Sequence, residues 1–105
     1  MAEQKYTKFD ELKKYSNFDV AQRKAEEYLG NDTVLFTSPR AGKKYRIYDT
    51  NKCKWVDFGM MGFEDFTKHQ DDERRQRYLA RANRIQGNWK DNPFSPNNLS
   101  IHILW

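Results

Sequence analysis

Two β-prone runs on either side of a short polar loop constrain this sequence more than any other feature. Residues 44–48 and residues 53–58 are rich in aromatic and β-branched side chains, and residues 49–52 between them read Asp-Thr-Asn-Lys. Such a pattern is typical of a β-hairpin with a four-residue loop. Because side chains alternate between the two faces of a strand, each run presents one apolar face. The residues expected on these faces are Tyr45, Ile47, Val56 and Phe58.

An amphipathic helix is predicted before the hairpin, over residues 18–29. Its apolar side chains recur at helical spacing. Ser16 or Asn17 can cap its start, and Gly30 can end it. A capping-box spacing at residues 7–10 predicts a shorter helix still nearer the N-terminus. The apolar positions of the longer helix are Phe18, Ala21, Ala25, Tyr28 and Leu29.

A second long helix is predicted after the hairpin, ending at Gly87. His69, Asp71 or Asp72 can cap it, and the acidic run at residues 71–73 suits the positive end of its dipole. Its apolar face is formed by Tyr78, Ala82 and Ile85 at helical spacing. Four arginines lie on an adjoining stripe, which makes this helix basic: Arg74, Arg77, Arg81 and Arg84.

The remaining segments complete a prediction of the α+β class. Residues 33–37 are a short β-prone run, and residues 88–98 are rich in Asn and Pro, as loops are. Residues 101–105 are apolar, and we expect them to dock on the body as a strand or extended arm. The expected fold is a small single domain, residues 1–105. It has an N-terminal helical segment, a central β-hairpin, a second basic amphipathic helix and an extended C-terminal segment.

Composition supports a folded domain and excludes several classes of protein. Only 37% of the residues are apolar, but aromatic residues reach 15% of the chain, and each can bury roughly 150–250 Å². The single cysteine, Cys53, permits no intrachain disulfide, and with His69 and His102 it lacks the spacing of a zinc site. No apolar run approaches the roughly 18 residues of a membrane span, and residues 1–5 lack a signal-peptide pattern. We expect a protein made and kept in a reducing, cytosolic setting.

No constellation of an enzyme active site is recognisable. Residues 57–59 read Asp-Phe-Gly, the magnesium-binding tripeptide of protein kinases, but the glycine-rich and catalytic loops that must accompany it are missing. His69 lies near several carboxylates, yet no nucleophile completes a site, which favours a capping or hydrogen-bonded structural role. Cys53 is expected to be a small packed residue within a strand. We therefore expect no catalytic residue, no cofactor and no small-molecule substrate.

The charge pattern leaves several uses open for the basic residues. The formal net charge is +4, which permits contact with nucleic acid or with acidic protein surfaces. The arginine stripe can be a solvated helix face, a protein interface or a phosphate-binding surface. Aromatic residues interleaved with lysine and arginine in the hairpin suit a small core better than base stacking, since no glycine-flanked aromatic motif of the RNA-recognition type is present. The basic residues of the hairpin are Lys43, Lys44 and Arg46.

From residue 43 onward the chain has a strand that ends in Val-x-Phe-Gly, an aromatic segment that ends in Thr-x-His, a basic helix, a Trp-based turn and an apolar close that ends in Leu-Trp. In this order and spacing, the chain resembles a small basic protein family of the nucleocytoplasmic large DNA viruses. Phe63 and Phe66 replace the usual tyrosines, and Ala82 and Asn83 replace a histidine and lysines. Residues 1–42 lie outside the resemblance. The corresponding residues here are Lys54 to Gly59, Gly62 to His69, Asp72 to Arg74, Arg77, Tyr78, Arg81, Asn88, Trp89 and Ile103 to Trp105.

This resemblance implies a viral, virion-associated structural protein without a known activity. We expect a minor capsid component, made in the host cytoplasm, that binds capsid proteins in the virion shell. Leu104 and Trp105 would serve in docking, and residues 1–42 would be a helical extension or attachment arm beside the family-like module, residues 43–105. The alternative is a virion nucleic-acid-binding or packaging protein, with weak DNA binding. Its contacts would be Arg74, Arg77, Arg81, Arg84, Lys43, Lys44 and Arg46.

Overall fold

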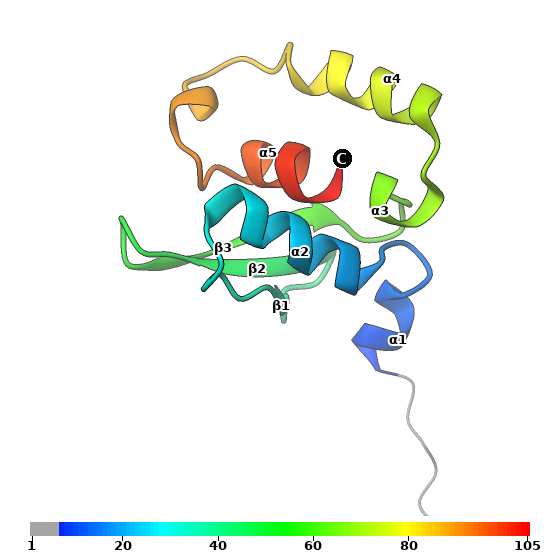
Figure 1. Ribbon diagram of the computed structural model, residues 1–105, viewed down its shortest axis with the longest axis horizontal. Coiled ribbons are helices and arrows are strands. Elements are labelled where there is room, and N and C mark those ends of the chain that lie inside the picture. Colours follow the sequence, from blue (N-terminus) through cyan, green and yellow to red (C-terminus); the bar gives the residue numbers. More distant parts are fainter. Residues whose placement is uncertain (1–6) are drawn as a thin grey trace, which may run out of the picture.

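Three antiparallel strands in the order β1-β2-β3 form the sheet of the computed structural model, which describes residues 7–105 (Figure 1). Residues 1–5, where the sequence lacks a signal-peptide pattern, lie outside this range. In the β2–β3 hairpin Tyr45 pairs with Phe58 and Ile47 with Val56, so the predicted hairpin and its apolar face are confirmed. The strands are β1 (Phe36–Thr37), β2 (Lys43–Asp49) and β3 (Lys54–Met60).

The hairpin loop is shaped by the side chain of Asp49. Its Oδ1 accepts hydrogen bonds from the main-chain N–H groups of Asn51, at 2.9 Å, and Lys52, at 3.1 Å. Cys53 closes the loop with a φ of 52°, in the left-handed region, and its side chain is exposed. The prediction that Cys53 is packed within a strand is therefore wrong, because the hairpin loop spans residues 50–53, one position later than predicted, and includes Cys53.

Both predicted N-terminal helices are present, with the caps that the sequence indicates. Thr7 and Asp10 form a reciprocal capping box on α1 (Lys8–Leu12). Asn17 caps α2 (Phe18–Leu29) by accepting a hydrogen bond from Val20 N, and Gly30 ends it with a φ of 119°. As far as it is described, from residue 7, this N-terminal region is not a separate arm, because it supplies part of the hydrophobic core. Its core residues are Leu12, Ala21, Ala25 and Leu35.

Two helices occupy the region where one was expected. Asp65 caps α3 (Phe66–His69), and Asp71 caps α4 (Asp72–Ala82), as one of the predicted alternatives. Gln70 separates them with a left-handed φ of 56°. The helix α4 ends at Ala82 rather than at Gly87, so Ile85 lies beyond it and is 52% exposed.

The C-terminal region is helical, which corrects the prediction of an extended strand or arm. A 3-10 turn η1 (Trp89–Asp91) is followed by α5 (Pro96–Leu99), which continues directly into the π-helix η2 (Ser100–Leu104). Ser95 caps α5 through its side chain, and Pro96 suits the first turn. The helical path brings Leu99 and Ile103 onto one face, four residues apart, where both are fully buried.

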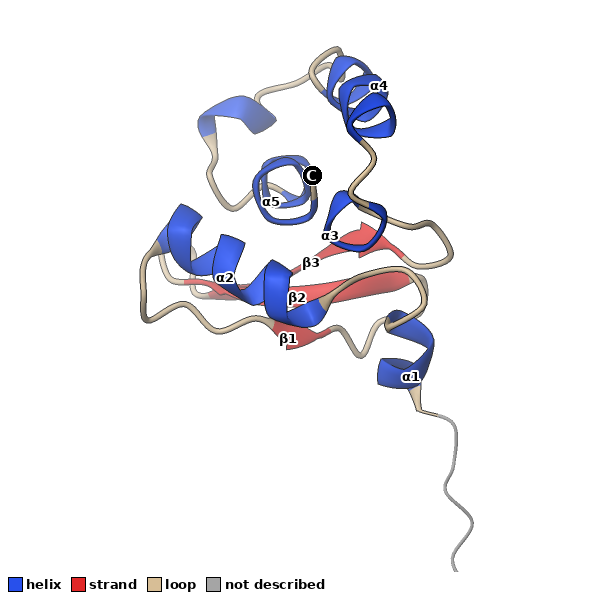
Figure 2. Cartoon of the chain, turned by 45° about the vertical axis from the view of Figure 1, so that its right-hand side comes forward, coloured by secondary structure: helices blue, strands red, loops and turns tan. Residues whose placement is uncertain are grey.

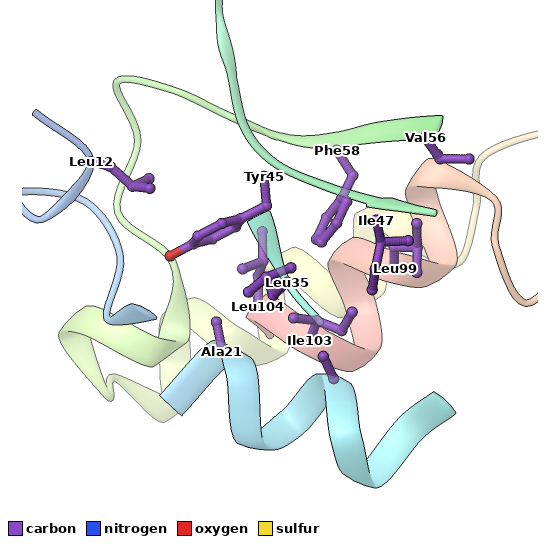
Figure 3. Close-up of a cluster of buried hydrophobic side chains, with 11 residues drawn as sticks. Leu12, Ala21, Leu35, Tyr45, Ile47, Val56, Phe58, Leu99, Ile103 and Leu104 are labelled. Carbon is purple, nitrogen blue, oxygen red and sulfur yellow. The ribbon is translucent and has the colours of Figure 1, made fainter. Parts of the chain in front are cut away.

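The core lies between one face of the sheet and the helices α2 and α5–η2 (Figures 2 and 3). Phe58 points from β3 toward the C-terminal helix that carries Ile103, whereas the ring of Tyr45 runs across the sheet. Both aromatic side chains are fully buried. Phe18 and Leu29 pack against this cluster while remaining partly exposed. The arrangement is an α+β fold, in which α4 stands away from the sheet.

Candidate binding groove

A groove of about 840 Å³ separates α4 from the end of β3 and from α5–η2. Its existence follows from the position of α4, which is joined to the body through α3 and through aromatic stacking at the C-terminus. The ring of Tyr78 stacks on Trp105 with centroids 4.2 Å apart, and Arg75 Nε donates a 2.7 Å hydrogen bond to the main-chain oxygen of Trp105. Trp105, a predicted docking residue, therefore lines the groove. It also fixes the position of α4, which forms the opposite wall.

Leu104 forms the buried floor of the groove. Only 1% of its surface is exposed, so the prediction that it docks a partner is wrong, and it serves as a core residue. It packs against Gly59, where φ is 78° and where an added Cβ would lie 2.8 Å from Leu104 Cδ1. A side chain at position 59 would therefore collide with the floor of the groove.

Cationic side chains from two distant segments meet at this groove. Arg77 and Arg81 of α4 are exposed and line it together with Lys43, which starts β2. Arg74 also lines it, but its guanidinium lies 3.2 Å from the Glu64 carboxylate in a half-exposed ion pair. Of the predicted arginine stripe, three members thus face the groove, whereas Arg84 is exposed outside it.

Lys44 is not a surface contact, which corrects the prediction made for it. Its side chain is 3% exposed, and Nζ lies 3.0 Å from Asp65 Oδ2 and 2.5 Å from the carbonyl oxygen of Phe63. Burial lowers the pKa of Lys44 from its ordinary value, while the Asp65 carboxylate partly opposes that shift. The lysine is therefore a structural cation beneath the groove.

A buried polar network that the sequence did not reveal surrounds this ion pair. The hydroxyl of Tyr45 donates to Ser16 Oγ at 2.7 Å, and Ser16 Oγ lies 3.2 Å from Thr67 Oγ1. Thr67 in turn donates to Asp65 through both its hydroxyl and its main-chain N–H. Burial raises the pKa of Tyr45 well above its ordinary value, so the phenol stays protonated and can donate. The network joins the connection between α1 and α2, through Ser16, to β2 and α3.

The uncovered face of the sheet carries an aromatic cluster. Trp55 meets Phe36 at 5.5 Å and Tyr48 at 5.3 Å, both edge to face, and all three are more than 40% exposed. Arg46 stacks over Trp55 at 4.7 Å and lies 3.3 Å from Asp57 Oδ1. These contacts engage its guanidinium, which corrects the prediction that Arg46 is free to contact a phosphate. The expectation that the hairpin aromatics form core holds for Tyr45 and Phe58, but not for this cluster.

His69 has a structural setting in the loop between α3 and α4. Its Nδ1 accepts a 2.9 Å hydrogen bond from Asp71 N, so a neutral ring carries its proton on Nε2, which is buried. Burial, with a further contribution from Arg74, lowers the pKa of His69 from its ordinary value. Within residues 7–105, no group of three or more His, Cys, Asp or Glu side chains could hold a metal ion.

Over residues 33–82 the chain matches the model of a family of unknown function (DUF5754). No curated protein and no solved structure shows significant similarity to the chain. The matched segment runs from just before β1 to the end of α4, so it includes the cationic wall of the groove but not Leu104 or Trp105. In the part of the chain that the structure describes, no helix is long and apolar enough to cross a membrane.

Proposed function

We propose that this protein is a small structural adaptor that docks a partner protein in the groove beside α4. Drawing on the resemblance to proteins of large DNA viruses, we place it in the virion shell as a minor capsid component made in the host cytoplasm. The partner would be a capsid protein. The proposal assigns the chain no catalytic residue, no cofactor and no small-molecule substrate.

The observation that carries the proposal is the combination of exposed apolar and cationic side chains around the groove. Met60, Phe63 and Ile85 all line it and are 62%, 64% and 52% exposed, respectively. Arg77 and Arg81 stand beside them. Aromatic residues, methionine and arginine are the residue types enriched at protein–protein interfaces, and arginine and large aromatic residues dominate their energetic centres. A groove with this lining suits a protein segment better than a uniformly charged ligand.

Nucleic-acid binding is the second candidate, and the same cations favour it. Ion pairing weakens this candidate, because Lys44, Arg46 and Arg74 already face carboxylates. The cations that remain of the predicted set are Lys43, Arg77, Arg81 and Arg84. Four phosphate contacts would give a salt dependence of log K of about −3.6 on duplex DNA, which predicts weak, non-specific binding at physiological salt.

The test is incorporation of groove variants into purified particles, followed by cross-linking mass spectrometry. Arg77→Glu and Phe63→Ser should each reduce incorporation and remove cross-links to shell proteins, while the melting temperature stays close to that of the wild type. Arg23→Glu is the matched control, since Arg23 is exposed on α2 and does not line the groove. A chain absent from virions, or recovered only with the genome after the shell is removed, contradicts the proposal.

A further inference from the structure

The two edge strands of the sheet, β1 and β3, differ in how well their outer main-chain groups are protected from pairing with another strand. Beside β1, side chains of the N-terminal helices occupy main-chain groups. Lys8 Nζ donates to the carbonyl oxygens of Ser38, at 2.6 Å, and Arg40, at 2.5 Å. The Gln22 amide, in turn, bonds to Leu35 N and Thr33 O, both at 2.8 Å. This side therefore offers few free groups to an incoming strand.

At the outer edge of β3, by contrast, the main-chain groups have no such protection. Ser38 N donates to Lys44 O, so alternate residues of β2 from Lys44 onward face β1, and those between them face β3. By the observed pairing, Trp55 and Asp57 then direct their main-chain N–H and C=O groups away from β2. Within residues 7–105, no loop or side-chain hydrogen bond uses these main-chain groups. Unpaired edge groups of this kind are a template for another strand.

The open edge of β3 leads into the groove. Gly59 and Met60, at the end of β3, line the groove together with Arg77 and Arg81. A segment paired with β3 would therefore continue past Met60 toward the arginines. Its side chain opposite Trp55 would lie on the same face as that ring, next to the exposed aromatic cluster.

We infer that the partner presents an extended acidic segment, which adds to β3 as a fourth strand and places carboxylates against Arg77 and Arg81. This inference rests on the adaptor function proposed above and specifies the chemistry of its partner. We choose this occupant by charge complementarity: Lys43, Arg77 and Arg81 line the groove, and the carboxylate side chain of Glu64, which also lines it, is already paired with Arg74. A second copy of this chain, with net charge +4, would bring like charges to the same groove.

Strand addition divides the interaction into two parts with different roles. Main-chain hydrogen bonds to Trp55 and Asp57 would supply affinity without regard to sequence. Specificity would come from a large apolar residue opposite Trp55 and from acidic residues that reach the arginines. The expected ligand is thus an extended peptide with an apolar residue followed, toward the groove, by Asp or Glu.

The experiment uses the whole chain and synthetic peptides of about ten residues, the length of a long strand. One peptide alternates valine with glutamate, a second has lysine in place of glutamate, and a third is the glutamate peptide with N-methyl groups on alternate residues. Binding is followed by calorimetry and by amide hydrogen exchange. The glutamate peptide should slow exchange at Trp55 and Asp57 and bind at least about tenfold more tightly than the lysine peptide, a difference of ~1.4 kcal/mol. The N-methyl peptide should lose at least as much affinity, relative to the glutamate peptide, as the lysine peptide does.

The variant Arg77→Glu/Arg81→Glu should reverse the preference in favour of the lysine peptide, whereas Arg23→Glu should leave it unchanged. Unprotected amides at Trp55 and Asp57 at millimolar glutamate peptide would overturn the inference. A dimer by sedimentation, with those amides already protected, would assign the edge to a second copy instead. Tighter binding of an oligothymidine of similar length would assign the groove to nucleic acid.

These outcomes are separable from a failure of the adaptor proposal. Particle incorporation that depends on Arg77 and Phe63, without protection at Trp55, would keep the adaptor and reject strand addition. Conversely, peptide binding as described, by a chain absent from virions, would keep strand addition and reject the place in the virion shell.

Discussion

Replacing Asp65 with asparagine tests whether the buried ion pair is essential to the fold. The change keeps the shape of the side chain but removes the charge that faces Lys44 Nζ at 3.0 Å, where both side chains are at most 3% exposed. Leaving one member of a buried pair without its partner costs about 3–5 kcal/mol. For a domain of this size, such a loss lowers the melting temperature by more than about 12 °C.

Thermal and urea unfolding, compared with those of Glu64→Gln, measure the effect. Glu64 also loses an ion pair, with Arg74, but both partners are 40% exposed, so its removal should cost at most about 1 kcal/mol. The double variant Lys44→Met/Asp65→Asn should recover part of the loss, because it removes the orphaned cation as well. An Asp65→Asn variant as stable as Glu64→Gln would refute this reasoning.

The pH dependence of the same variant provides an independent check. Burial already lowers the pKa of Lys44 in the folded protein, and Asp65 opposes that shift. Without Asp65 the folded-state pKa must fall further, so the unfolded chain binds the proton more tightly over a wider range. The unfolding free energy of the variant should therefore rise with pH up to the unfolded pKa of about 10.4. A deficit that stays constant from about pH 7 to pH 10 would exclude an orphaned lysine as its cause.

Two further perturbations follow from the packing. Phe58→Ala removes a fully buried ring between Tyr45 and the C-terminal helices, and it should cost about 3–5 kcal/mol in urea unfolding. Deleting residues 1–16 removes buried Leu12 and the Ser16 hydroxyl of the polar network. It should lower the melting temperature markedly in calorimetry, rather than weaken attachment alone.

Each has a control in the same chain. Phe58→Leu should cost clearly less than Phe58→Ala, since it leaves a smaller cavity. Deleting residues 1–6, which precede the capping box of α1, separates attachment from folding. A truncation of residues 1–16 that melts like the wild type would show that this segment is dispensable to the core, and a Phe58→Ala protein of wild-type stability would show the same of that ring.

The elements that could be predicted from the sequence are those whose signals are local. Alternation set which hairpin residues face the core, as seen in the Tyr45–Phe58 pair. Caps at Asn17 and Asp71 marked helix starts, because the first N–H groups of a helix need nearby acceptors. The arginine stripe of α4 could also be predicted, because helical spacing is a local property of the sequence.

Only the tertiary structure decided the burial and the contacts of side chains whose partners are distant in sequence. Lys44 belongs to the outward set of β2 by alternation, yet Asp65, twenty-one residues away, draws it inside. The apolar close at residues 101–105 suits a strand equally well by composition, and it is helical because Leu99 and Ile103 together cover the sheet. The groove exists because Tyr78 stacks on Trp105, a contact between segments that no local pattern connects. Sequence by itself therefore determined the elements and their polarity, whereas packing between distant segments determined which charges are buried and where a partner can bind.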